Sequence, residues 1–168
     1  MTRNWMVVFS VVPIGVTVLA VARGVQAKGD DLAEITALEA RLVKAVNASD
    51  IDGVMAVYLP NEKLFVFDVV PPRQYVGAKA YREDWKGFFG GPVSYQSSDL
   101  AVETHGDLAF GHKIFHAVGT DVGGTKYDFT ARVTDVYRKI NGKWLIVQEH
   151  VSVPVDLASG KADLASKP

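Results

Sequence analysis

Apolar side chains recur at three- and four-residue steps after Asp30, which is the spacing of one face of an α-helix. This stripe consists of Leu32, Ile35, Leu38, Leu42 and Val46, and the charged residues between them are Glu34, Glu39, Arg41 and Lys44. We expect the apolar face to pack and the charged positions to face water. The cap-forming side chains of residues 47–52, NASDID, interrupt the pattern, and a short second helix is expected to end before Pro60.

A strand-like alternation follows in residues 64–68, LFVFD, and its inward-facing positions end on Asp68. After a loop with two prolines, Gly77 begins a third predicted helix, which ends at FFGGP, residues 88–92. One side of this helix is an apolar stripe formed by Ala78, Tyr81, Trp85 and Phe88. The alternation leaves a carboxylate on an apolar face, so Asp68 either caps a neighbouring group or points into a pocket.

The rest of the chain predicts four strands separated by the turns HGD, TDVGGT and NG. Their approximate bounds are 94–105, 108–119, 127–140 and 144–155. Helices followed by an antiparallel meander indicate an α+β fold in which one curved sheet wraps the helices. We expect the tail, residues 156–168, to be frayed and flexible, with a weak helix as the alternative.

The first 27 residues differ from the rest, because an uncharged apolar block follows a short polar start and ends in small residues before Lys28. This layout is typical of a cleaved signal peptide, so a periplasmic or secreted location is expected for a domain of residues 28–155. An uncleaved membrane anchor is the alternative. The block is slightly shorter than the roughly 20 apolar residues that a spanning helix needs, and it contains Pro13 and Gly15.

Composition narrows the classes of partner. With 168 residues, of which 48% are hydrophobic, the chain fits one domain with an ordinary core. The net charge is −1 and there is no basic run, so neither nucleic acid nor, after signal cleavage, a membrane is an expected partner. There is no cysteine, so the fold must rely on its core without a disulfide framework.

Several kinds of chemistry lack support in the sequence. His112 and His116 are four residues apart, but on a strand this spacing separates them by roughly 13 Å, too far for a shared metal ion. A GxSxG motif and a Ser-His-Asp or Cys-His signature are absent, and the Gly-Gly pairs lie in predicted turns. We therefore expect no metal, no cofactor and no nucleophilic catalysis.

Polar residues inside otherwise apolar strands are the remaining candidates. By strand alternation, Asp68 shares a face with Leu64 and Val66, Asp135 with Val133 and Tyr137, and His116 with Ile114 and Val118. Any one of them is as readily a rim residue or a hydrogen-bonded core group as a functional residue. Three polar residues converging from three strands favour a site.

The pairing of the last two strands decides which of Glu149 and His150 joins Asp135. A two-residue turn at Asn141-Gly142 places Asp135 opposite residue 148, on the face of His150. A three-residue loop places it opposite residue 147, on the face of Glu149 and Val151. The sequence leaves both registers open.

The order of elements resembles the SnoaL-like branch of the nuclear transport factor 2-like superfamily, which is related to ketosteroid isomerases and to the association domain of calcium/calmodulin-dependent kinase. The motifs that carry the resemblance are NASDIDGVMAVY, YVGAKAYREDW and VTDVYRKINGKWLIVQEHVS. It covers residues 31–155 and implies a cone-shaped roll, with three helices packed in a curved antiparallel sheet around a mostly apolar pocket.

The resemblance to ketosteroid isomerases implies that Asp68 is the general base and that Asp135 is a protonated acid that donates to the oxyanion. The tyrosine of that oxyanion hole falls on Leu42, which cannot donate. The pocket arginines of the kinase association domain fall on His116, Asp135 and Val151, so its preference for anions is not expected here. That comparison favours the three-residue loop and turns Glu149 toward the cavity.

Two classes of function follow from these residues. The first is a cofactor-free isomerase, dehydratase or cyclase that acts on a small apolar carbonyl compound, with Asp68 as base and Asp135 or His116 stabilising the oxyanion. The alternative is a non-catalytic ligand-binding module or a homodimerisation module. The expected ligand contacts are Tyr58, Trp85, Ile114, Tyr137, Glu149 and Val151.

Overall fold

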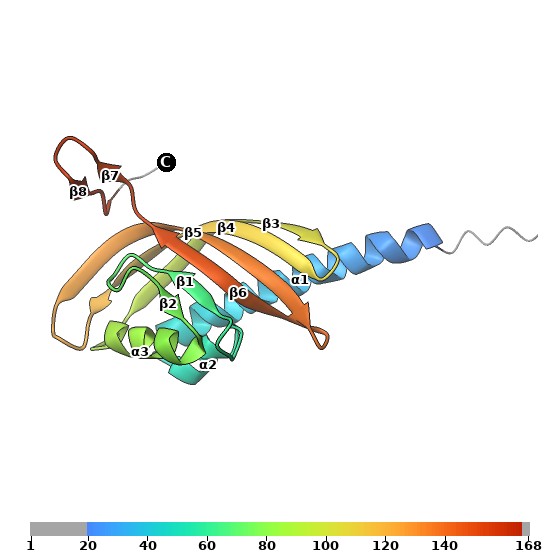
Figure 1. Cartoon of the computed structure of the whole chain (residues 1–168), viewed down its shortest axis with the longest axis horizontal. Coiled ribbons are helices and arrows are strands. Elements are labelled where there is room, and N and C mark those ends of the chain that lie inside the picture. The colour runs from blue at the N-terminus through green and yellow to red at the C-terminus, as the bar shows by residue number, and fades with distance from the viewer. Residues whose placement is uncertain (1–19, 166–168) are drawn as a thin grey trace, which may run out of the picture.

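The computed structural model describes residues 20–165, with side chains from Gly29 onward (Figure 1). Residues 1–19 of the predicted signal peptide, which spans residues 1–27, lie outside the described part of the chain. Residues 20–27 form the beginning of the first helix. None of the helices in the described part is both long enough and apolar enough to cross a membrane.

The three predicted helices are present as α1 (Ala20–Asn47), α2 (Ile51–Met55) and α3 (Ala78–Phe88). The expected cap of α2 is supplied by Asp50, whose side chain accepts a hydrogen bond from the backbone N–H of Gly53. This cap lies three residues after the end of α1 and begins α2.

The packing stripe of α1 differs from the prediction at two positions. Ile35, Leu38, Leu42 and Val46 are fully buried as expected, but Leu32 is 44% exposed. Glu39, which was expected to face water, is only 4% exposed. The position of Glu39, four residues after Ile35 and three before Leu42, places it on the buried face, where it finds polar partners described below.

One six-stranded sheet forms the second layer, in the order β2-β1-β6-β5-β4-β3. The strands are β1 (Phe65–Phe67), β2 (Tyr75–Val76), β3 (Ser94–His105), β4 (Leu108–Thr120), β5 (Lys126–Ile140) and β6 (Lys143–Ser152). The predicted antiparallel meander is confirmed for β3 to β6. The expectation of a wholly antiparallel sheet is wrong, because β6 returns in the same direction as β1 and pairs parallel to it.

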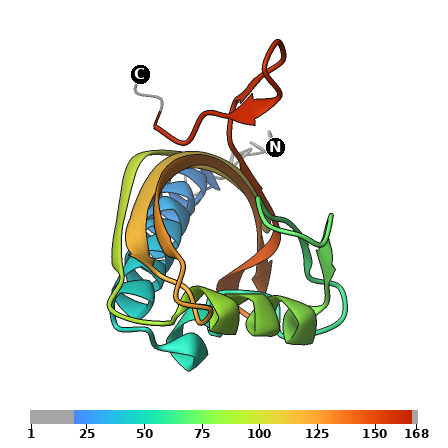
Figure 2. The same ribbon diagram turned by 90° about the vertical axis from the view of Figure 1, so that its left-hand side faces the viewer.

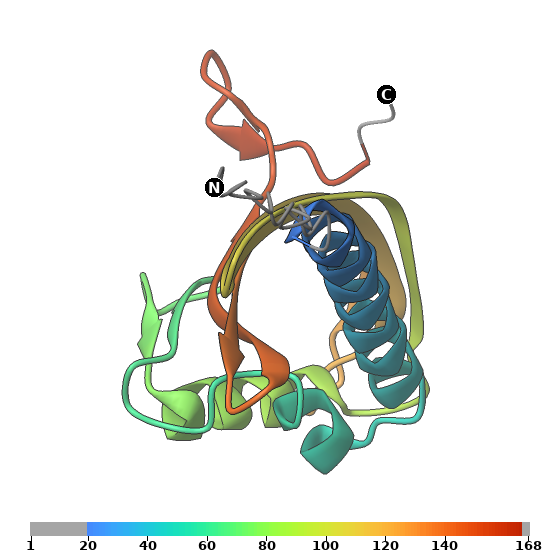
Figure 3. The same ribbon diagram turned by 90° about the vertical axis from the view of Figure 1, so that its right-hand side faces the viewer.

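The sheet curves around α1, and α3 lies across one end of the curve (Figures 2 and 3). A single core of buried apolar side chains joins the inner face of the sheet to the helices. This arrangement is the expected cone-shaped α+β roll. It directs alternate residues of β3 to β6 toward the same interior.

The last hairpin has a register that neither expected alternative describes. Its turn has two residues, Asn141 and Gly142, with φ of 52° and 76°, as in a type I′ turn. One extra residue in β6, Val147, then forms a β-bulge. The bulge shifts the pairing by one residue, so Asp135 lies directly opposite Glu149 and both carboxyls share the inner face.

The end of the chain differs from the expected frayed segment or weak helix. Residues Val155–Asp156 (β7) pair with Lys161–Ala162 (β8) in a small separate hairpin. The backbone N–H of Thr130 donates to the carbonyl oxygen of Leu164, which attaches this hairpin to β5. Residues 166–168 lie outside the described part of the chain.

Gly77 generates a prediction about the start of α3. Its φ of 86° and ψ of 148° belong to a region that only glycine readily adopts, and a Cβ there would lie 2.6 Å from a carboxylate oxygen of Glu62. Gly77→Ala should therefore lower the free energy of unfolding, measured in urea, by about 1–3 kcal/mol.

A matched control lies near the end of the same helix. A Cβ at Gly87 would meet no heavy atom within 4 Å. Gly87→Ala should leave the stability unchanged or raise it by about 0.5–1 kcal/mol, because alanine is the better helix former. Equal losses in the two variants would show that the conformation of Gly77 is not the cause.

Candidate functional site

A cavity of about 330 Å³ is lined by α3, by the inner face of β3 to β6 and by the segment after β1. Its walls are mostly apolar and aromatic, and its charged side chains come from the loop at Asp68, from α3, from the turn between β4 and β5 and from β6. The lining residues are Tyr58, Asp68, Val69, Val70, Tyr81, Asp84, Trp85, Gly87, Phe88, Tyr95, Phe115, Asp121, Tyr127, Phe129, Val133, Glu149 and Val151.

Asp68 directly follows β1, where the strand alternation places it on the face of the buried residues Leu64 and Val66. The backbone N–H of Val69 donates a hydrogen bond to its Oδ1. The pKa of Asp68 is raised to about 6, mainly by burial and also by the nearby charge of Asp84, whereas the backbone N–H groups of the next two residues oppose the shift. The carboxyl can therefore both accept and donate a proton near neutral pH.

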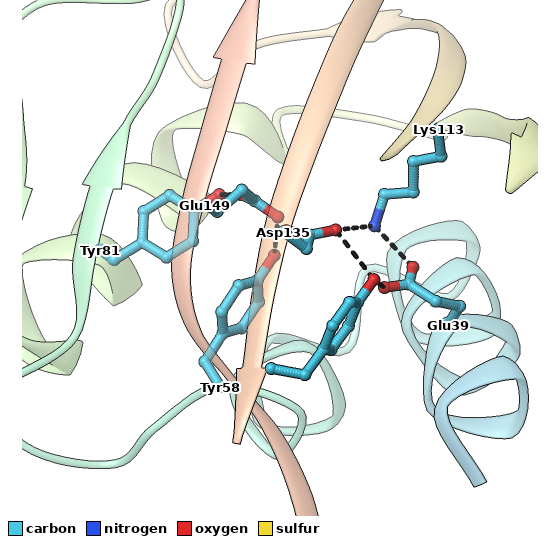
Figure 4. A network of polar contacts seen from close by, with 7 residues as sticks. Glu39, Tyr58, Tyr81, Lys113, Asp135 and Glu149 are labelled. Carbon is cyan, nitrogen blue, oxygen red and sulfur yellow. Dashed lines mark hydrogen bonds and ion pairs between the residues drawn. The ribbon is translucent and has the colours of Figure 1, made fainter. Parts of the chain in front are cut away.

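Glu149 is the second carboxyl at the cavity, and it is only 3% exposed. Its Oε2 accepts a hydrogen bond of 2.9 Å from the hydroxyl of Tyr58, and its Oε1 accepts one of 2.5 Å from the hydroxyl of Tyr81 (Figure 4). Burial raises the pKa of Glu149, although Lys113 and the Tyr81 hydroxyl oppose the shift. The two tyrosine hydroxyls are thereby committed to this carboxyl.

An ion network lies next to Glu149 and centres on Lys113 of β4, which is 2% exposed. Its Nζ lies 2.5 Å from Oε2 of Glu39 and 2.9 Å from Oδ2 of Asp135. The Tyr137 hydroxyl donates to Oε1 of Glu39 over 2.8 Å. Burial alone would lower the pKa of Lys113, but the two carboxylates outweigh it and raise this pKa, so the lysine stays charged.

Asp135 connects the ion network to the cavity. Burial raises the pKa of Asp135 to about 7; Lys113 opposes the shift and the adjacent carboxyl of Glu149 adds to it. Oδ1 of Asp135 has no hydrogen-bond partner within the described residues. The carboxyl of Glu149, which lies opposite Asp135, disfavours ionisation of Asp135 because both are out of water.

Most of the residues expected at the site lie at or beside the cavity. Those that line it are Asp68, Tyr58, Trp85, Glu149 and Val151. Asp135 and Tyr137 lie behind this surface, where the ion network holds both side chains. These are positions in the structure, and the roles of the residues in binding or catalysis remain predictions.

The expected inward positions of His116 and Ile114 are wrong. His116 is exposed, and its Nε2 lies 2.7 Å from Oδ1 of Asp128 on the outer face of the sheet. The alternation of β4 runs the other way and turns Lys113 and Phe115 inward. The sequence favours the face of Ile114 as the inner one, because the alternative turns Lys113 inward and a lysine seldom lies inside a core.

Three polar residues of the interior were missed from the sequence. Glu39 had a signal, because its spacing from Ile35 and Leu42 continues the apolar stripe of α1. Tyr81 belongs to the apolar stripe of α3, and that stripe gives no signal for the hydrogen bond of its hydroxyl to Glu149. Lys113 had no local signal, because only its partners from α1 and β5 make its burial possible.

Trp85 lines the cavity and carries a buried hydrogen-bond donor. Its indole Nε1–H is shielded from solvent and has no hydrogen-bond acceptor within the described residues. Such a donor costs free energy unless an acceptor reaches it.

In the described part of the chain, no group of three or more histidine, cysteine, aspartate or glutamate residues is arranged to hold a metal ion.

The ion network predicts a large effect at Lys113. Lys113→Met should lower the free energy of unfolding by about 3–5 kcal/mol, because it leaves Glu39 and Asp135 buried without their cation. Lys86→Met removes an exposed ion pair with Glu83 on α3 and should cost about 1 kcal/mol or less. Urea unfolding of both variants measures the difference, and a comparable small loss at Lys113 would contradict the network's role.

The raised pKa of Asp68 predicts the sign of a pH dependence. The folded state binds the proton of the Asp68 carboxyl more tightly than the unfolded chain does. Protonation of Asp68 therefore stabilises the fold fully below about pH 4, and this stabilisation is lost as the pH rises through about 6. Two pKa units correspond to about 3 kcal/mol, and partial exposure reduces the effect to about 1–2 kcal/mol.

Asp68→Asn should therefore be more stable than the natural protein at pH 8, and this advantage should disappear at pH 3. Asp107, at an exposed turn, supplies the matched control Asp107→Asn, for which little change is expected at either pH. Urea unfolding at both pH values, with a carbon-13 NMR titration of the Asp68 carboxyl, tests this. A midpoint near pH 4 would contradict the assignment.

Comparison with known proteins places this arrangement in a family. A family model described as a SnoaL-like domain matches residues 35–156. Among solved structures, a nuclear transport factor 2-like protein of unknown function from Pseudomonas putida KT2440 is 30% identical, with 86% of this chain and 98% of that chain covered and a TM-score of 0.71. No curated protein matches the sequence.

Two more distant structures share the fold. A nuclear transport factor 2-like superfamily protein from Salmonella enterica serovar Typhimurium LT2 is 20% identical, covering 77% of this chain and 94% of that chain, with a TM-score of 0.64. A protein from Novosphingobium aromaticivorans that is proposed to be a scytalone dehydratase is 13% identical, covering 86% and 93%, with a TM-score of 0.67. The match of the family model and the 30% identical structure show that the chain belongs to the SnoaL-like domain family of the nuclear transport factor 2-like superfamily.

Proposed function

We propose that the chain binds a small, largely apolar organic molecule in the cavity and that Asp68 transfers a proton on this molecule without a cofactor. The observation that carries the proposal is the position of Asp68 at an aromatic cavity, with a pKa of about 6. A base whose pKa lies close to the working pH is half ionised there and yet basic enough to remove a proton next to a carbonyl.

The cavity supports this assignment by its shape and lining. A volume of about 330 Å³ is at the lower end of the range for small-molecule sites, and apolar walls with few polar groups are typical of such sites. The Trp85 indole N–H can donate to a carbonyl or hydroxyl oxygen of the ligand. Such a bond would stabilise negative charge that develops on this oxygen as Asp68 removes the proton.

Isomerisation and elimination of water both fit this arrangement, because each can begin with proton removal beside a carbonyl. The relative from Novosphingobium aromaticivorans is proposed to be a dehydratase, and its likeness to this chain is one of fold. The oxygen-binding donor would differ from that of ketosteroid isomerases, because Leu42 occupies the expected tyrosine position inside the core.

A second candidate function is ligand binding without chemistry. The observation that favours it is that the hydroxyls of Tyr58 and Tyr81 are both hydrogen-bonded to Glu149. A bound oxygen would have to compete with this carboxyl for either hydroxyl. Under this alternative, Trp85 orients the ligand and the raised pKa of Asp68 is a consequence of burial alone.

Native mass spectrometry of the purified full-length chain, followed by release of any bound molecule, would identify the class of ligand. The catalytic test uses 2-tetralone, an apolar aromatic ketone, in D₂O, with NMR to follow loss of the protons next to the carbonyl. The natural protein should accelerate this exchange over buffer, and Asp68→Asn should slow it by about 100-fold or more while 2-tetralone binding persists.

Asp128→Asn is the matched control, because it removes the same charge from the outer face of the sheet. It should exchange protons at the natural rate. Equal rates in the natural protein and Asp68→Asn would remove Asp68 as the base. Binding of 2-tetralone without any acceleration over buffer would instead favour the non-catalytic function.

A further inference from the structure

The charged groups around the cavity all carry the same sign. Its titratable carboxyls are Asp68, Asp84, Asp121 and Glu149. The described residues that line the cavity include no lysine, arginine or histidine. A ligand that enters therefore meets carboxylates and no protein cation, which disfavours an anionic molecule.

The cavity wall is also unusually aromatic, with eight aromatic residues among those that line it. These are Tyr58, Tyr81, Trp85, Phe88, Tyr95, Phe115, Tyr127 and Phe129. The ring of Trp85 lies 6.0 Å from that of Tyr81 and 5.5 Å from that of Phe88, which in turn stacks on Tyr127 at 4.5 Å. The faces of such rings attract organic cations.

Asp68 and Asp84 line the same cavity. The charge of Asp84 contributes to the raised pKa of Asp68, and neither carboxyl forms an ion pair within the described residues. Asp84 accepts a hydrogen bond of 2.6 Å from the Tyr75 hydroxyl. Burial raises the pKa of Asp84, and this hydrogen bond opposes the shift. Where both carboxyls are ionised, a bound cation would relieve the repulsion between Asp68 and Asp84.

Lys113 does not supply this missing positive charge. Its Nζ is enclosed by Glu39 and Asp135, and Lys113 is absent from the cavity lining. Even this network contains more carboxyls than cations, because Glu149 adjoins Asp135. The interior as a whole thus favours a positive guest over a negative one.

We propose that the cavity accepts an aromatic or apolar organic cation, a protonated amine or a quaternary ammonium compound, whose nitrogen lies near Asp68 and Asp84 against the aromatic wall. This inference rests on the proposed ligand-binding function and specifies the class of its ligand. The carboxylates supply the charge and the rings supply both apolar contact and cation–π attraction. No covalent step is required for this selectivity.

The test uses three probes of similar size and opposite or no charge, namely 2-phenylethylamine, 2-phenylethanol and phenylacetate. Their dissociation constants are measured by isothermal titration calorimetry on the full chain at pH 8, where Asp68 is ionised and the amine is protonated. The amine should bind about tenfold tighter than the alcohol, and phenylacetate should bind most weakly.

The double variant Asp68→Asn/Asp84→Asn should lose most of the preference for the amine while still binding 2-phenylethanol. Asp128→Asn, on the outer face, should retain the natural preference. Thermal melts of both variants confirm folding, and removing buried carboxylates is not expected to destabilise the protein at this pH.

The outcomes distinguish the two proposals. Equal or tighter binding of 2-phenylethanol than of the amine would overturn the cation preference and leave the apolar ligand site standing. Tightest binding by phenylacetate would likewise overturn it. A preference for the amine that survives in the double variant would overturn the placement at Asp68 and Asp84. Failure of all three probes to bind would contradict both proposals.

Discussion

The ammonium group of Lys113 is the buried cation that holds the two layers of this fold together at their centre. It reaches from β4 to Glu39 on α1 and to Asp135 on β5, with all three side chains almost fully buried. A charge in such a place is tolerated only when its partners are fixed at hydrogen-bonding distance. The ion network therefore sets how α1 lies against the sheet, and the apolar core packs around that constraint.

The bulge at Val147 extends the influence of this cation to the cavity. By shifting the register of β6, it places Glu149 opposite Asp135 and turns its carboxyl toward Tyr58 and Tyr81. The interior thus holds two adjacent polar clusters, one around Lys113 and one around Glu149, which meet where Asp135 lies opposite Glu149. A connected cluster in a medium of low dielectric constant resists partial change, since each lost partner leaves a desolvated charge.

The same distribution of charge explains the character of the cavity. The one lysine of the network is engaged by Glu39 and Asp135, while the carboxyls of Asp68 and Asp84 face the aromatic wall without a protein cation among the described residues. The proposed proton transfer by Asp68 and the proposed affinity for a positively charged guest both rest on this excess of carboxylates. In the first proposal the carboxyl of Asp68 exchanges a proton with the ligand, and in the second it pairs with the positive charge of the ligand.

The sequence by itself determined the order of the three helices, of β1 and of the meander β3 to β6, and with them the α+β class, because period and turn chemistry are local properties. The pocket positions of Asp68 and Trp85 followed from the family resemblance. The tertiary structure alone decided what depends on contacts between distant residues. The inward face of β4 was decided by the partners that Lys113 finds at Glu39 and Asp135. The register of β6 was decided by a bulge, which leaves no signature in its alternating residues. Burial of a charge and slippage by one residue are settled by free energies summed over the whole fold, so no local pattern encodes them.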